Sequence, residues 1–126
     1  MKTILVVDDE SALVETLTDL LQYEGYRVIS ANNGETALAR LLNDKPDLIL
    51  TDFMMPLSNG LDLIRSVHAL PAFREVPVVM MSAVSKSIAV SSNHEEGPLK
   101  LAGYLNKPFQ LEPLLALVAK LIGKAA

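Results

Sequence analysis

Hydrophobic residues follow two different spacings along this chain. Short, continuous apolar runs predict strands that are covered on both faces, because such strands need apolar side chains on each side. Leucine-rich stretches with an apolar residue at every third or fourth position predict amphipathic helices. The strands are expected at residues 4–7, 27–31, 48–51, 78–81 and 104–106, and the apolar helix faces at residues 13–21, 37–42, 61–67 and 111–122.

Strand and helix alternate along the chain, which predicts a parallel sheet with right-handed crossovers and helices on both faces. Residues 84–101 interrupt the pattern, because their apolar face is weak and Pro98 cannot lie inside a regular helix. We expect a short or displaced fourth helix there. The prediction is one α/β domain over residues 1–126, with five strands and five helices, the fourth of them irregular.

Composition and charge exclude several classes of protein. Half of the 126 residues are apolar and 21% are charged, which is typical of a globular domain. A net charge of −4 without a lysine or arginine cluster argues against direct nucleic-acid binding. The absence of cysteine excludes disulfides and thiolate zinc sites. No apolar run is long enough for a membrane span or a signal-peptide core, so we expect a cytoplasmic domain without membrane insertion.

Polar side chains stand where four of the predicted strands end. Asp8 and Asp9 follow the first strand, Asp52 the third, Ser82 the fourth and Lys107 the fifth. In an open parallel sheet these strand ends share one edge, where ligands bind, so we expect the five side chains to lie close together. Three carboxylates crowded in this way repel one another unless their pKa values rise or a cation joins them.

A hard divalent cation would relieve this crowding. Mg²⁺ suits a site with few carboxylates and several waters. We predict Asp9 and Asp52 as direct ligands, Asp8 as a ligand through water, and a backbone carbonyl near Met54 as a further ligand.

The same edge has the parts of a phosphoryl-transfer site. Asp52 is the predicted nucleophile, which would form an acyl phosphate. The Lys107 ammonium would offset charge on the transferred oxygens, and the Ser82 hydroxyl would donate a hydrogen bond to one of them.

Four motifs together resemble the receiver domain of two-component response regulators, of the single-domain kind found in chemotaxis and phosphorelay proteins. They are Asp8-Asp9, Asp52-x-x-Met55-Pro56-x-x-x-Gly60, Ser82-Ala83 and Tyr104-x-x-Lys107-Pro108-Phe109. The resemblance covers essentially the whole chain. It implies a flavodoxin-like fold with strand order 2-1-3-4-5.

The resemblance also implies a function. Asp52 would accept a phosphoryl group from a phosphohistidine of a histidine kinase or histidine phosphotransferase. Ser82 and Tyr104 would form the switch, and the surface of the fourth helix, fifth strand and fifth helix would bind a downstream protein. One departure is that receivers usually carry Gly-Ala where this chain has Lys100 and Leu101. If the chain is complete, its effect is expected through docking on another protein.

Three other functions compete with this interpretation. A phosphatase of the haloacid dehalogenase type would need a second aspartate where Met54 stands. A flavodoxin would need a phosphate loop rich in serine, threonine and glycine, where Asp8-Asp9-Glu10 would repel the phosphate. A degenerate receiver would act as a scaffold without phosphorylation. We expect a signalling module and not a turnover enzyme.

Overall fold

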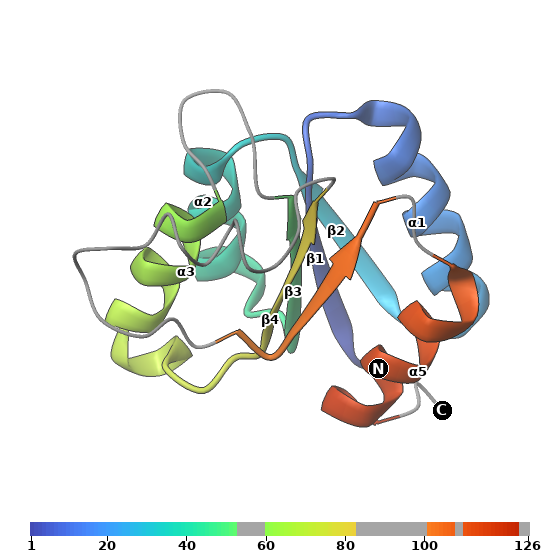
Figure 1. Ribbon diagram of the computed structural model, residues 1–126. Coiled ribbons are helices and arrows are strands. Elements are labelled where there is room, and N and C mark those ends of the chain that lie inside the picture. Colours follow the sequence, from blue (N-terminus) through green and yellow to red (C-terminus); the bar gives the residue numbers. More distant parts are fainter. Residues whose placement is uncertain (53–59, 83–100, 108–109, 124–126) are drawn as a thin grey trace.

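Five parallel strands form the centre of the structure, in the order β2-β1-β3-β4-β5 (Figure 1). The computed structural model describes residues 1–52, 60–82, 101–107 and 110–123. The strands are β1 (Thr3–Val7), β2 (Arg27–Ala31), β3 (Leu48–Asp52), β4 (Val78–Ser82) and β5 (Gly103–Asn106). The parallel sheet and its order are those expected from the sequence.

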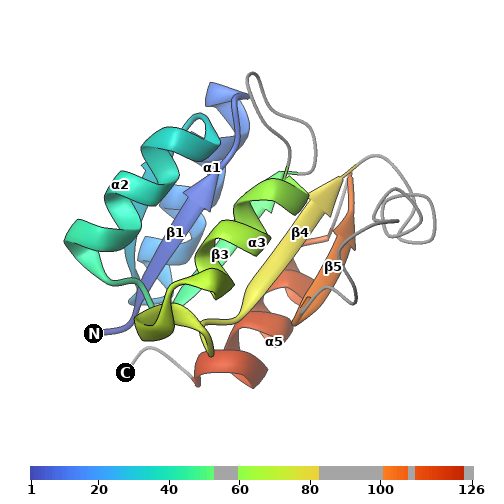
Figure 2. The same cartoon turned by 90° about the vertical axis from the view of Figure 1, so that its left-hand side faces the viewer.

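Helices cover both faces of the sheet. Among the described residues they are α1 (Ser11–Tyr23), α2 (Gly34–Asp44), α3 (Gly60–Ala69) and α5 (Leu111–Ile122), with a short 3₁₀ helix, η1 (Pro71–Phe73). Helices α1 and α5 lie on one face, and α2 and α3 on the other (Figure 1). Figure 2 shows α3 in front of the sheet and α5 behind it.

The continuous apolar runs have the burial that the sequence predicts. Every residue of β1, β3 and β4 is buried, because these strands lie inside the sheet and have a helix layer on each face. Successive side chains point to opposite faces. Ile4 and Val6 therefore pack with α1 and α5, whereas Leu5 and Val7 pack with α2 and α3.

The two ends of α2 show how local chemistry sets helix bounds. Asn33 is the N-cap of this helix, and its side chain accepts a hydrogen bond from the Thr36 N–H at 2.8 Å. At the other end, Lys45 has φ 48° and ψ 65°, and its N–H donates to the Leu41 carbonyl. Lys45 therefore holds a left-handed conformation that favours glycine.

Helix α5 packs closely on the sheet at two points. A Cβ on Gly103 would lie 2.7 Å from Cδ2 of Leu117, so the missing side chain gives α5 room over β5. The buried Tyr26 hydroxyl donates to the Gly123 carbonyl at 2.9 Å, which ties the end of α5 to the start of β2. Burial, followed by the nearby Glu24 charge, raises the pKa of Tyr26.

Several sequence predictions concern parts of the chain outside the described residues. They are the irregular fourth helix at 84–101, of which only residue 101 is described, the backbone carbonyl of Met54, and Ala83, Pro108 and Phe109. Within the described ranges, no helix combines the length and apolar character that a membrane span requires.

Candidate functional site

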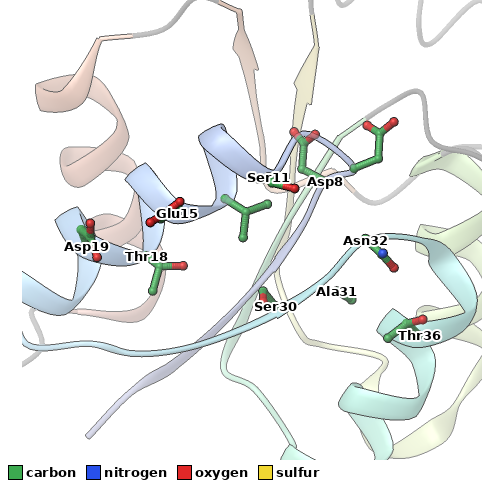
Figure 3. Close-up of a pocket in the computed structure, with 11 residues that line it drawn as sticks. Asp8, Ser11, Glu15, Thr18, Asp19, Ser30, Ala31, Asn32 and Thr36 are labelled. Carbon is green, nitrogen blue, oxygen red and sulfur yellow. The ribbon is translucent and has the colours of Figure 1, made fainter.

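The carboxyl ends of the strands bring the predicted site residues to one edge of the sheet. Asp52 is the last residue of β3 and pairs with Met81, and Ser82 is the last residue of β4. Asp8 directly follows β1, and Lys107 directly follows β5. Asp8 and Asp9 also line one end of a groove between α1 and α2 (Figure 3).

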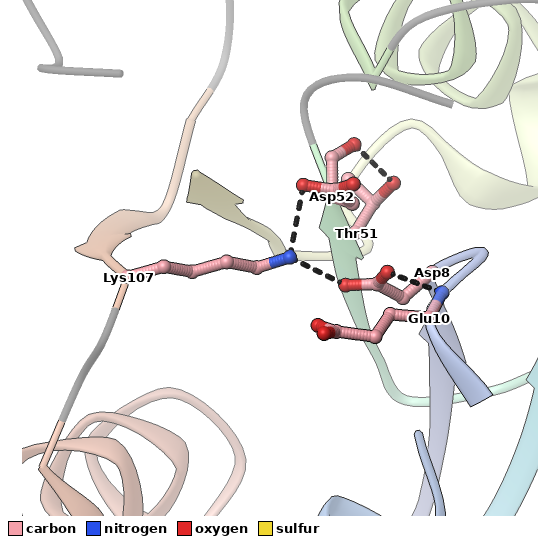
Figure 4. Close-up of polar contacts among 5 residues, drawn as sticks. All are labelled: Asp8, Glu10, Thr51, Asp52 and Lys107. Carbon is pink, nitrogen blue, oxygen red and sulfur yellow. Dashed lines mark hydrogen bonds and ion pairs between the residues drawn. The ribbon is translucent and has the colours of Figure 1, made fainter. Parts of the chain in front are cut away.

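Lys107 reaches across this edge to two carboxylates (Figure 4). Its Nζ lies 2.8 Å from Oδ2 of Asp8 and 3.2 Å from Oδ1 of Asp52. The Lys107 N–H donates to the Ser82 carbonyl at 2.7 Å, which holds Lys107 beside the end of β4. A single ammonium therefore joins the ends of β1 and β3.

The surroundings of Lys107 keep its ammonium charged. Burial alone would lower its pKa, since a low dielectric disfavours the charged form. The hydrogen bond and negative charge of Asp8, with smaller contributions from Asp52, outweigh burial and leave the pKa of Lys107 raised above its ordinary value of 10.5. Lys107 is therefore a fixed cation at neutral pH.

Both carboxylate oxygens of Asp8 are engaged. Oδ2 binds Lys107, and Oδ1 accepts a hydrogen bond from the Glu10 N–H at 2.9 Å (Figure 4). The second bond turns the chain from β1 into α1. Acidic residues and serine before a helix often cap its first N–H groups with their side chains. Glu10 instead occupies the cap position without a side-chain cap bond, and Ser11 is already the first helical residue.

Three carboxylates could hold a metal ion. Asp8, Asp9 and Asp52 each offer one oxygen, and these oxygens lie within 4.8 Å of one another. Asp9 is exposed, whereas Asp8 and Asp52 are buried. A set of oxygen donors with one solvent-facing member fits a hard divalent cation that keeps some of its waters. The engaged oxygens of Asp8 leave it better suited to contact an ion through water.

The two predicted switch residues lie on neighbouring strands. Ser82 is buried at the end of β4. Tyr104 is half-buried on β5, pairs with Met80, and packs against the core layer under α2 and α3. Their role as a switch stays a prediction.

Thr51 is a site residue that the sequence reasoning missed. Its side chain is fully buried, and Oγ1 donates to the Asp52 carbonyl at 3.1 Å (Figure 4). This bond fixes the peptide unit of Asp52. The sequence did contain a signal for this residue, a single hydroxyl next to Asp52 in an otherwise apolar run. A hydroxyl buried in such a strand needs a hydrogen-bond partner, which predicts a contact close to Asp52.

The whole chain resembles known signalling proteins. The sequence matches the family described as "Response regulator receiver domain" over residues 4–119. It is 38% identical over 125 residues to the transcriptional regulatory protein CpxR of Escherichia coli (strain K12), covering 99% of this chain and 51% of that protein. It is 38% identical over 115 residues to the DNA-binding response regulator MtrA of Mycobacterium tuberculosis, covering 91% and 48%. The chain thus spans about half the length of these relatives.

Solved structures agree with the sequence comparison. The chemotaxis response regulator CheY4 of Vibrio cholerae superposes with a TM-score of 0.83 at 27% identity, covering 96% of this chain and 98% of that one. A response regulator receiver protein from Pseudomonas putida superposes with a TM-score of 0.82 at 30% identity, covering 94% and 96%.

Proposed function

The chain belongs to the response regulator receiver domain family, and from this premise we propose that Asp52 accepts a phosphoryl group from a phosphohistidine. The donor would be a histidine kinase or a histidine phosphotransferase. One observation carries the assignment: the Lys107 ammonium lies 3.2 Å from Oδ1 of Asp52 and 2.8 Å from Asp8, at the edge of the sheet where ligands bind.

The proposed reaction is an in-line transfer to Asp52. A carboxylate oxygen of Asp52 attacks the phosphorus, the phosphorus–nitrogen bond of the phosphohistidine breaks, and the imidazole leaves with a proton from solvent. The product is an acyl phosphate on Asp52. Lys107 offsets negative charge on the transferred oxygens, and the Ser82 hydroxyl donates to one of them. Thr51 holds the Asp52 peptide in place during the transfer.

We propose that the carboxylate cluster holds Mg²⁺. Asp9 and Asp52 would be its direct ligands, Asp8 would contact it through water, and the backbone carbonyl of Met54 would be a further ligand. When bound, the ion adds positive charge beside the transferred phosphoryl group. The support is the 4.8 Å cluster of carboxylate oxygens and its exposed member, Asp9.

The proposed output is a changed surface for a downstream protein. Ser82 would move toward the phosphoryl group, the Tyr104 ring would turn inward, and the surface around β5 and α5 would change. The chain would catalyse only its own phosphorylation and dephosphorylation, in the cytoplasm. The relative MtrA is named a DNA-binding response regulator, which conflicts with the expectation that this chain contacts no nucleic acid directly. We therefore confine that expectation to residues 1–126, whose net charge is −4.

Incubation with Mg²⁺ and acetyl phosphate, followed by intact-mass measurement, tests the proposal. We expect one phosphoryl group on the wild type and none on Asp52→Asn. Asp62→Asn is the matched control, because Asp62 is an exposed aspartate on α3, and it should be labelled like the wild type. Equal labelling of Asp52→Asn, or no labelling of the wild type, would refute the assignment. Many cycles of phosphate-ester hydrolysis would favour a phosphatase instead.

A further inference from the structure

A groove of about 540 Å³ lies between α1 and α2, next to the carboxylate cluster (Figure 3). We call it the α1–α2 groove. One side is formed by Ser11 of α1 and by the α1 side chains three, four, seven and eight positions after it, which share one face of the helix. The lining comprises Asp8, Asp9, Ser11, Val14, Glu15, Thr18, Asp19, Ser30, Ala31, Asn32 and Thr36. The end of β2 lies between the two helices, and within the described sheet β2 has β1 as its single neighbour.

The charge of the α1–α2 groove has one sign. Asp9, Glu15 and Asp19 are exposed carboxylates along it, and among the described residues no lysine, arginine or histidine lines it. Asp8 is different, because Lys107 and the Glu10 N–H already engage its oxygens. The remaining lining is short and neutral, mostly hydroxyl and small apolar groups. A ligand of this groove would therefore need positive charge.

The spacing of the carboxylates fits an extended chain. Glu15 and Asp19 are four residues apart on α1, which is about 6 Å along a helix axis. Alternate side chains of an extended peptide point the same way and repeat at about 6.6 Å. Cationic side chains at alternating positions would thus meet Glu15 and Asp19 in turn.

We propose that the α1–α2 groove binds an extended segment of a partner protein with lysine or arginine at alternating positions. Such a segment would lie along α1 and the end of β2, with its cations on Glu15 and Asp19. This binding surface is separate from the phosphoryl-transfer chemistry, since neither Glu15 nor Asp19 takes part in that chemistry. It is also distinct from the surface around β5 and α5 invoked for the output.

Fluorescence anisotropy with a labelled ten-residue peptide of alternating lysine and serine tests the proposal. The titration is done with EDTA and without Mg²⁺, so its result does not depend on the proposed metal site. We expect saturable binding that weakens as salt is raised from 20 mM to 200 mM, because exposed charges are screened. A peptide of alternating glutamate and serine should not bind. Absence of binding by the lysine peptide would overturn the proposal.

Paired variants locate the contact. Glu15→Gln with Asp19→Asn should weaken binding about fivefold or more. Asp62→Asn with Glu112→Gln changes the net charge equally, on α3 and α5, and should weaken it less than twofold. Equal weakening by both pairs would show nonspecific attraction and overturn the assignment. Acetyl-phosphate labelling of the Glu15/Asp19 variant should match the wild type. Amide shifts from the peptide should gather on α1, the end of β2 and the start of α2; shifts confined elsewhere would refute the site.

Discussion

The Lys107 ammonium lies 2.8 Å from an oxygen of Asp8, a carboxylate whose side chain has no exposed surface. A buried carboxylate is costly unless it is paired and hydrogen-bonded. Lys107 provides the charge, and the Glu10 N–H provides the second contact. The protein itself therefore supplies part of the positive charge that the crowded carboxylates require.

Removing this ammonium should destabilise the protein when Mg²⁺ is absent. Lys107→Gln leaves the Asp8 charge buried with one partner fewer, and we expect the free energy of unfolding to fall by about 1–3 kcal/mol in EDTA. Added Mg²⁺ should narrow the difference, because a divalent cation takes over part of the pairing. Urea denaturation with and without Mg²⁺ measures both effects. Lys120→Gln, an exposed lysine on α5, is the control. Unchanged stability of Lys107→Gln would contradict the role given to this ion pair.

The Lys107 contribution should also disappear at alkaline pH. Its pKa in the folded protein is raised above 10.5, so the folded state binds this proton more tightly than the unfolded state. The stabilisation is then fully present below pH 10.5 and is lost as the pH rises through the folded pKa. The stability difference between the wild type and Lys107→Gln should be constant from pH 7 to 9 and shrink above pH 10.5. A difference that grows with pH would have the wrong sign.

Tyr26 makes a second alkaline prediction at another place in the fold. Tyr26→Phe removes the hydrogen bond to the Gly123 carbonyl and should cost about 1 kcal/mol at pH 7. Burial raises the Tyr26 pKa above 10.0, so folding favours the neutral phenol and its contribution falls as the pH passes 10.0. The deficit of the variant should therefore narrow above pH 10. Exposed Tyr23 is the control, since Tyr23→Phe should leave stability unchanged. A pH-independent Tyr26→Phe deficit would show that the phenol does not titrate in this way.

Gly103 and Leu117 should be coupled. A Cβ at residue 103 would lie 2.7 Å from one methyl group of Leu117 and 3.2 Å from the other, so Gly103→Ala should cost about 1 kcal/mol as Leu117 shifts. In a Leu117→Ala background the same change should cost nothing, because the obstructing methyl groups are gone. A double-mutant cycle of unfolding free energies measures the coupling. Additive costs would mean that the strain arises elsewhere.

Lys45 is a place where stability can be gained. It holds φ 48° at the end of α2, where a Cβ is disfavoured. Lys45→Gly should raise the free energy of unfolding by about 0.5–1 kcal/mol. Lys45→Ala keeps the Cβ and should bring no gain, which separates backbone relief from loss of the lysine charge. Equal effects of the two changes would point to the charge instead.

The hydrophobic pattern predicted most of the fold for a clear physical reason. Strands covered on both faces, as β1 and β3 are, must be apolar throughout, and such runs stand out in the sequence. Carboxyl ends of parallel strands share an edge, so Asp8, Asp52 and Lys107 could be grouped from the sequence alone. The strand order rested on the resemblance to receivers, because apolar runs do not record which strands are neighbours.

Other features depend on three-dimensional reach and could not be read from the sequence. The ammonium of Lys107 contacts Asp8 more closely than Asp52, and this depends on how the lysine crosses from β5 to β1. In the sequence, Gly103 is simply the residue before Tyr104. Its contact with Leu117 depends on how α5 crosses β5. The cap formed by Asn33 is different, because asparagine before a helix is a common N-terminal signal and could have been predicted from the sequence.

Asp52 ends β3, the middle strand, which has a neighbour on each side and helices above and below. The amides of such a central strand are expected to be among the most strongly protected from hydrogen exchange in the fold. Phosphorylation of Asp52 would therefore leave β3 in place, and any displacement would occur in the segments that follow the strand ends. The β3 amides should accordingly exchange slowly, and at the same rate, in the unphosphorylated and the phosphorylated protein.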